Sequence, residues 1–149
     1  MPKSPAPRPA RATIRVRVGT GALDLAVPDA MEPEALRARV ERWLTGCADR
    51  FDDIATPDGT HFQRACWEAC RGIPRGETRT YAWLAAAAGS PAAVRAAGQA
   101  MRRNPLPIVV PCHRVTASGG RPGGFSGSSR AESMAIKRCL QEVERGIDR

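Results

Sequence analysis

The sequence has no long hydrophobic run. Its longest apolar stretches, around Trp83–Ala88 and Leu106–Cys112, are much shorter than the roughly 20 apolar residues of a membrane-spanning helix. The first twelve residues, MPKSPAPRPARA, are basic and rich in proline and lack the apolar centre of a signal peptide. We therefore expect no membrane partner and a cytoplasmic location.

Metal-ligating patterns are also absent. The chain has only 2 histidines and 5 cysteines, with no CxxC spacing, whereas a structural zinc site needs four ligands. We expect neither a metal site nor a cofactor. Five cysteines leave one unpaired in any full disulfide scheme, which favours free thiols in a reducing compartment. Cys66, Cys70 and Cys139 fall among apolar helical positions and are predicted to fill the core.

Lysine is nearly missing. The chain has 2 Lys and 21 Arg, and with 15 acidic residues its formal net charge is +8. Alanine, arginine, glycine and proline make up 73 of the 149 residues, so part of the arginine excess is explained by G+C-rich codon usage. However, the stretch Thr78–Ala131 holds seven arginines and no acid. This stretch predicts a nucleic-acid surface, with codon bias as the alternative.

The length predicts one compact domain with a short appendage. Residues 1–12 are expected to form a tail because prolines prevent a regular ladder or helix. Alternating apolar residues predict a hairpin from strands over 13–18 and 22–27, and helical spacing predicts a helix over 32–44. The polar loop 49–59 is the predicted boundary, which gives an N-terminal segment over 13–58 and a main domain over 59–149.

The main domain is rich in helix signals. Caps and stops predict a helix from Thr60 to Gly72, one over 80–88, and one capped by Ser90 that ends near residue 103. A strand over 106–110, a loop over 116–127 and a final helix over 130–145 follow.

A two-residue turn between the second and third of these helices indicates a helix-turn-helix. Arg95 and Arg102 lie seven residues apart on one face of the third helix, which is rich in alanine and glycine. Those small residues fit either close approach to a ligand or tight helix packing.

Cys112 is the candidate nucleophile. It follows an apolar segment and Pro111, and it precedes His113 and Arg114. A neighbouring imidazole or positive charge lowers a thiol pKa, so we predict a reactive thiolate, with a buried structural cysteine as the alternative. In an extended segment the Cys112 and His113 side chains point to opposite sides, so a direct bond between them is not assured and a water could bridge them.

The segment NPLPIVVPCHRV, residues 104–115, resembles the active-site segment of the O6-alkylguanine-DNA alkyltransferases. Other matches follow in the family's order: FQR with Trp67, IPRGET over 73–78, Tyr81, SPAAVRAAG over 90–98, GFSG over 124–127, and the stretch from Lys137 to Glu144. The resemblance covers about 59–146. It implies an α/β fold with a mostly α C-terminal domain: a winged-helix-like helix-turn-helix alkyltransferase domain behind a short, truncated α/β N-terminal segment.

The resemblance also implies a chemistry. Cys112 would take the alkyl group from guanine O6 in a single turnover, with His113 as base through a water and Glu144 orienting the imidazole. Tyr81 would donate a hydrogen bond to the departing purine, and Asn104 would hold the turn before the active-site segment.

The implied partner is double-stranded DNA containing O6-alkylguanine, bound by a monomer through the minor groove. The target base must rotate out of the stack, and Arg95 would fill the space it leaves. The remaining implied DNA contacts are Arg102, Ser90, Gln63 and Ser118, and the implied base pocket is formed by Val115, Ser126 and Phe125.

Three features depart from the family pattern. Phe125 replaces the usual tyrosine, the stretch between Gly127 and Lys137 is about five residues longer than usual, and the N-terminal segment is short. Two other functions stay open at this point. A non-enzymatic lesion-binding protein would lack the nucleophile that Cys112 provides, and a helix-turn-helix regulator would not need His113, Glu144 and Tyr81 around one thiol.

Overall fold

The structure is a computed structural model that describes residues 12–117 and 130–146. At the N-terminal end, β1 (Thr13–Val18) pairs antiparallel with β2 (Gly21–Ala26). Alternate residues of β1 are buried, from Ile14 to Val18, and Gly19 turns the chain with a φ of 59°. Helix α1 (Pro33–Leu44) packs against β1. The period-two pattern thus forms the expected hairpin, with one face covered by a helix.

The rest of the chain is mainly helical. α2 (His61–Arg71) begins with a capping box, in which the Thr60 hydroxyl accepts from Gln63 N and the Gln63 side chain accepts from Thr60 N. α3 (Tyr81–Ala87) and α4 (Val94–Arg102) form the helix-turn-helix, and α5 (Arg130–Arg145) closes the chain.

The predicted start of α4 is wrong. The helix begins at Val94 with Ala93 as its N-cap, and Ser90 does not cap it. Instead, Ser90 O accepts a hydrogen bond from Ala93 N, so residues 90–93 form a separate turn before the helix. Proline at the first helical position is a common pattern, but here Pro91 initiates a turn.

Two short parallel strands were not predicted. β3 (Arg79–Thr80) pairs with β4 (Val115–Thr116), in the register Arg79↔Val115 and Thr80↔Thr116. β3 leads directly into α3, and β4 directly follows a single 3-10 turn, η1 (Cys112–Arg114). The pairing therefore places the start of α3 beside the segment that carries Cys112.

The predicted strand over 106–110 is also wrong. This segment contains only an isolated bridge between Pro107 and Val110. Val110 N donates to Leu106 O, and Ile108 has a φ of 76°. Three prolines in 105–111 lack the N–H that a ladder requires, so the apolar run folds into a compact buried turn.

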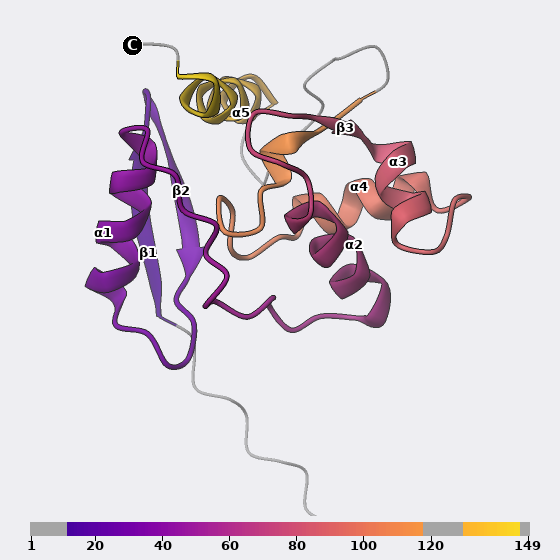
Figure 1. The fold of residues 1–149 in the computed structure, drawn as a ribbon, viewed down its shortest axis with the longest axis horizontal. Helices are drawn as coiled ribbons and strands as arrows, with labels where there is room; N and C mark the ends of the chain where they lie inside the picture. The colour runs from indigo at the N-terminus through magenta and orange to yellow at the C-terminus, as the bar shows by residue number, and fades with distance from the viewer. Residues whose placement is uncertain (1–11, 118–129, 147–149) are drawn as a thin grey trace, which may run out of the picture.

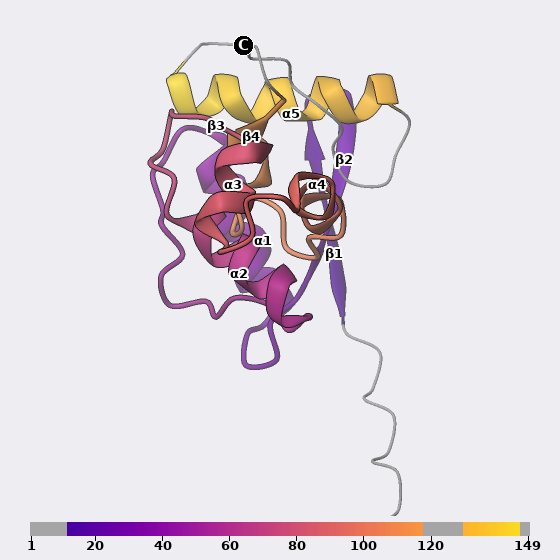
Figure 2. The same ribbon diagram turned by 90° about the vertical axis from the view of Figure 1, so that its right-hand side faces the viewer.

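The elements surround one continuous hydrophobic core that includes residues from β1, β2 and every helix from α1 to α5. Figure 1 shows the hairpin and α1 on one side and α2, α3 and α4 on the other, and Figures 1 and 2 both show α5 lying across one end of the molecule. Ala26 N of β2 also donates to Pro105 O at 2.8 Å. The fold is thus α/β with a mostly helical C-terminal part, and none of the helices in the described ranges is long and apolar enough to cross a membrane.

Candidate active site

The Cys112 thiol lies inside the protein, on the 3-10 turn η1, with 2% of the residue exposed. Asn104 Nδ2 donates to Cys112 Sγ at 3.2 Å and to Val110 O at 2.8 Å. Asn104 Oδ1 accepts from Leu106 N at 2.9 Å. One buried amide therefore holds both ends of the turn and contacts the sulfur directly.

His113 is completely buried beside Cys112. Its Nε2 lies 2.8 Å from Glu144 Oε1 on α5. Burial lowers the His113 pKa below its ordinary value of 6.5, so the ring is neutral at pH 7. Because Glu144 is a carboxylate, Nε2 carries the proton and donates it. Nδ1 is then the basic nitrogen, and it is buried without a hydrogen-bond partner in the described part of the chain.

Glu144 is shared between His113 and Arg114. Arg114 Nε donates to both carboxylate oxygens, at 3.0 and 2.9 Å, and Nη2 also donates to Oε2. Burial alone would raise the Glu144 pKa, but the hydrogen bonds from His113 and Arg114 lower it to about 2. Arg114 Nη1 donates to Ile73 O at 2.7 Å, which fixes the guanidinium against the loop after α2.

The predicted pKa of Cys112 is wrong in direction. Burial raises it to about 11, and the Asn104 hydrogen bond and the charge of Lys137 offset only part of this effect. The expected lowering of the Cys112 pKa fails for a geometric reason. The two residues that follow Cys112 in sequence, His113 and Arg114, both bind Glu144. The resting group is therefore a thiol, and it needs a base to ionise. The extended geometry expected for Cys112 and His113 is wrong too, because both lie in the 3-10 turn.

The N-terminal helix α1 contacts the imidazole directly. The Trp43 ring meets the His113 ring edge to face, with centroids 5.5 Å apart and an interplanar angle of 66°. On the other side, Gln141 Nε2 donates to His113 O at 2.9 Å. Neither contact was predicted, because each joins elements far apart in sequence.

A buried lysine completes the site. Lys137 on α5 has no exposed surface, and its Nζ donates to Tyr81 OH at 3.2 Å. Burial lowers the Lys137 pKa to about 8 and raises the Tyr81 pKa to about 12. The sequence does carry a signal for this role: Lys137 is one of 2 lysines among 21 arginines, and it lies four residues after Ser133 and three before Leu140, on the buried stripe of α5.

The outer face of the helix-turn-helix carries exposed arginines. Arg95 and Arg102 on α4 are exposed, and together with Tyr81, Gly98 and Gln99 they line an open hollow of about 400 Å³. Gly98 packs close to the Tyr81 ring, because a Cβ at that position would lie 3.9 Å from Tyr81 Cδ1. The hollow therefore leads from the arginine-bearing surface to the tyrosine of the site.

The other predicted site residues are more dispersed. Val115 is buried in β4 next to η1. Ser90 lies in the turn before α4, and the Gln63 side-chain oxygen is used by the α2 cap. Ser118, Phe125 and Ser126 lie outside the described residues. Within the described ranges no cluster of three or more His, Cys, Asp or Glu is arranged to hold a metal ion.

Comparison with known proteins identifies the family of this chain. The family described as "6-O-methylguanine DNA methyltransferase, DNA binding domain" matches residues 61–146, which include every side chain of the site except Trp43. This chain belongs to that family.

Curated relatives include the methylated-DNA–protein-cysteine methyltransferase of Methanosarcina barkeri, 42% identical over 74% of this chain and 66% of the relative. The constitutive methylated-DNA–protein-cysteine methyltransferase of Bacillus subtilis is 43% identical over 73% of this chain and 64% of the relative. The chain thus matches just under two thirds of the length of these family members.

Solved structures of the family share the fold. OGT of Mycobacterium tuberculosis, crystallised in complex with DNA, aligns with 90% of this chain and 93% of its own, with a TM-score of 0.73 and 29% identity. The O6-methylguanine-DNA methyltransferase of Pyrococcus kodakaraensis aligns with 80% of this chain and 69% of its own, with a TM-score of 0.62 and 32% identity. The first alignment includes most of the N-terminal segment as well as the family domain.

Proposed function

We propose that this protein repairs O6-alkylguanine in double-stranded DNA by transferring the alkyl group irreversibly to its own Cys112. The observation that carries the proposal is a buried Cys112 followed by a buried His113 whose imidazole contacts the buried Glu144 carboxylate, in a member of this family. A neutral imidazole that is held by a carboxylate at Nε2 and free at Nδ1 is suited to remove a proton from a thiol.

The thiol is activated by proton transfer. A water that bridges Cys112 Sγ and His113 Nδ1 carries the thiol proton to the imidazole, which becomes an imidazolium facing the Glu144 carboxylate. Such a bridge gives the buried Nδ1 atom the partner that the described part of the protein does not supply. Asn104 Nδ2 at 3.2 Å stabilises the thiolate that results.

The thiolate then attacks the alkyl carbon. A carbon–sulfur bond forms, the carbon–O6 bond breaks, and its electron pair passes to the guanine. Tyr81, which stays protonated because its pKa is about 12, donates a proton or a strong hydrogen bond to the departing base. Lys137, with a pKa of about 8 and its Nζ 3.2 Å from Tyr81 OH, is the more acidic of the two groups and restores the proton.

DNA is bound by the face that carries Arg95 and Arg102. We propose that α4 lies in the minor groove, about 6 Å wide in B-DNA, because the small residues of this helix let its backbone approach closely. Arg95 occupies the gap in the stack, and the flipped base enters the hollow above Tyr81 and Gly98. The buried Val115 is assigned to the base pocket, together with Phe125 and Ser126.

Ser90, Gln63 and Ser118 are proposed as further DNA contacts. The product thioether is a poor leaving group, so one chain repairs one lesion. We also propose a cytoplasmic location, in which the five cysteines, all free thiols in the structure, stay reduced.

A lesion-binding protein without transfer activity is the alternative. Intact-mass spectrometry of the protein mixed with an O6-methylguanine duplex distinguishes the two. We expect one added methyl group on the wild type and none on Cys112→Ala. Tight binding of the duplex with no change in mass would overturn the transfer and favour the alternative.

A further inference from the structure

The His113 imidazole is hydrogen-bonded at one of its two nitrogens. Nε2 lies 2.8 Å from Glu144 Oε1, and Nδ1 has no hydrogen-bond partner among the described residues. A bond at Nε2 leaves the ring free to turn about the line from Cβ to Nε2, because the second side-chain torsion of histidine has broad minima. This rotation moves Nδ1, the basic nitrogen, so a second contact has to set the plane of the ring.

Trp43 on α1 provides such a contact. Its ring packs against the His113 ring with the centroids 5.5 Å apart and an interplanar angle of 66°. Aromatic pairs of this kind have a preferred geometry. Trp43 is 1% exposed and His113 has no exposed surface, so neither ring can turn without disturbing the close packing around it.

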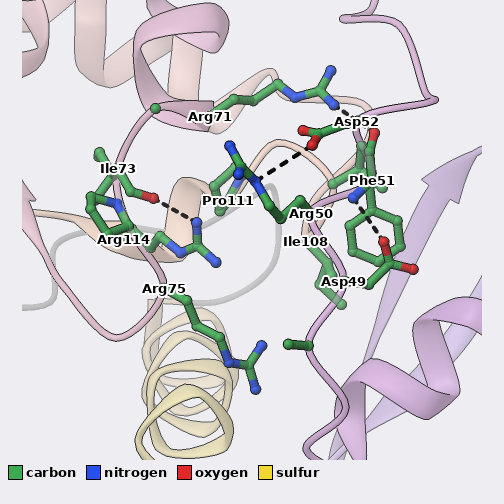
Figure 3. Close-up of a pocket in the computed structure, with 14 residues that line it drawn as sticks. Asp49, Arg50, Phe51, Asp52, Arg71, Ile73, Arg75, Ile108, Pro111 and Arg114 are labelled. Atoms are coloured by element: carbon green, nitrogen blue, oxygen red, sulfur yellow. Dashed lines mark hydrogen bonds and ion pairs between the residues drawn. The ribbon is translucent and has the colours of Figure 1, made fainter.

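Trp43 is fixed in turn by the segment that follows α2. The Arg75 guanidinium lies over the Trp43 ring, 5.3 Å from its centroid, and Arg75 Nη2 donates to Gly46 O at 3.4 Å. Two residues before Arg75, the carbonyl of Ile73 accepts from Arg114 Nη1 at 2.7 Å, a bond that Figure 3 shows. One short segment therefore fixes both the indole and the Arg114 side chain of the site.

A cavity comes close to the imidazole without reaching it. The space drawn in Figure 3 has a volume of about 450 Å³, and its wall includes Arg75, Pro111 and Arg114. Its lining, taken from the described residues, includes neither Trp43 nor His113. Since Arg75 lines the cavity and lies over the Trp43 ring, the indole is placed to keep solvent in the cavity away from His113.

We propose that Trp43 is a positioning residue for His113: its ring sets the plane of the imidazole and excludes water from it. This role rests on the proposed proton transfer from Cys112 to His113. Trp43 lies outside residues 61–146, the part of the chain that matches the family. The N-terminal segment thus supplies a residue on which the reaction depends.

The same packing keeps the imidazole neutral. Burial has the largest effect on the pKa of His113 and lowers it, against the opposing effect of Glu144. The positive charges of Arg114 and Lys137 lower it further. Trp43 contributes to the burial and brings no charge. A smaller side chain at this position lets water reach the ring, so the pKa of His113 should rise toward its ordinary value of 6.5.

Proton NMR of the full chain tests the contact without DNA. The chain has 2 histidines, so His61→Gln assigns the imidazole signals. In wild type, the ring current of the indole should displace the His113 ring protons from their usual position, and these protons should titrate below pH 6.5. In Trp43→Leu the displacement should disappear, and the midpoint should rise by at least about 0.5 pH. Trp43→Phe, which keeps an aromatic ring, should retain most of both features.

Single-turnover methyl transfer at a series of pH values tests the consequence for the reaction. The rate should fall as the pH drops through the His113 pKa, because only the neutral imidazole can accept a proton. In Trp43→Leu this fall should begin at a higher pH, and the rate at pH 7 should be lower by at least about tenfold because the base is misplaced. Trp43→Phe should restore most of the rate.

Two further variants separate positioning from stability. Leu36→Ala is the matched control, because Leu36 is buried on the same face of α1, two turns before Trp43. It should lower the melting temperature but keep the wild-type pH dependence. Trp43→Met fills more of the space without a rigid ring. It should behave like Trp43→Leu, and it provides the test if Trp43→Leu does not fold.

The inference is wrong if both ring-less variants of Trp43 keep the wild-type NMR signals and pH dependence. It is also wrong if Trp43→Phe is as slow as they are, or if Leu36→Ala shifts the pH dependence equally. The absence of methyl transfer in wild type would instead overturn the proposed function, whereas the NMR comparison tests the Trp43 contact alone.

Discussion

Replacing Lys137 with methionine should make the protein more stable and less active. The side chain is fully buried on α5, and its pKa falls from 10.5 to about 8 because burial penalises the charged form. At pH 7 the folded protein therefore keeps a desolvated ammonium group, which the unfolded chain exposes to water. Methionine has a similar length and shape and carries no charge.

The size of the effect follows from the two pKa values of Lys137. At about 1.4 kcal/mol per pKa unit, the buried charge destabilises the fold by about 3 kcal/mol at neutral pH. Losing the 3.2 Å hydrogen bond to Tyr81 costs about 1 kcal/mol. The net gain of about 2 kcal/mol should raise the melting temperature by roughly 4–8 °C for a chain of this length.

The gain should depend on pH. Between about pH 8 and 10.5 the unfolded chain holds the Lys137 proton more tightly than the folded one, so wild-type stability rises with pH in this window. The advantage of Lys137→Met should therefore shrink across the same window. Single-turnover methyl transfer should meanwhile fall at least about tenfold at neutral pH, since Tyr81 loses its proton source.

Thermal unfolding from pH 7 to 10.5, together with single-turnover repair, measures both effects. Arg138→Met is the matched control, because Arg138 is the exposed neighbour on the same helix and should change neither quantity substantially. A Lys137→Met protein that is less stable than wild type at pH 7, or equally fast in repair, would refute this role of the buried lysine.

Three further predictions concern the rest of the site. Glu144→Gln should slow transfer by about 10²–10⁴-fold in single-turnover assays, because the imidazolium loses its counter-charge. In wild type, the Glu144 contribution to stability is present above pH 4.5 and is lost as pH falls toward about 2, and acid unfolding of Glu144→Gln should lack this dependence. Asn104→Ala should destabilise the fold by about 1–3 kcal/mol in urea unfolding, because it leaves Leu106 N and Val110 O unpaired, and it should also slow transfer. Arg95→Ala should slow repair of duplex DNA with little effect on the reaction with free O6-methylguanine base; an equal loss on both would contradict its role in the stack.

Local sequence patterns predicted most of the elements. The alternation of Ile14, Val16 and Val18 predicted a half-buried strand, and the capping residue Thr60 predicted the start of α2. These features depend on neighbours a few positions apart, so the sequence alone contains them. The strand expected over 106–110 failed for an equally local reason, because the missing N–H groups of the prolines outweigh the apolar composition of the segment.

The electrostatics of the site could not be predicted from adjacency in sequence. His113 and Arg114 were expected to lower the pKa of the Cys112 thiol. In the structure the 3-10 turn directs both side chains toward Glu144, which lies 30 or more residues away in sequence. The Trp43 contact likewise depends on how α1 packs against η1. Lys137 is different, since the amino-acid sequence alone shows one of the chain's 2 lysines on a mostly apolar stripe of a helix in an arginine-rich chain.

The central claim is that Cys112 is the permanent acceptor of the alkyl group. The most direct measurement is peptide mass mapping after the protein reacts with an excess of O6-methylguanine duplex. We expect one methyl group per chain, located on Cys112, and no further repair after all of the protein has reacted. Repeated turnover, or a methyl group on any of the other four cysteines, would contradict the claim.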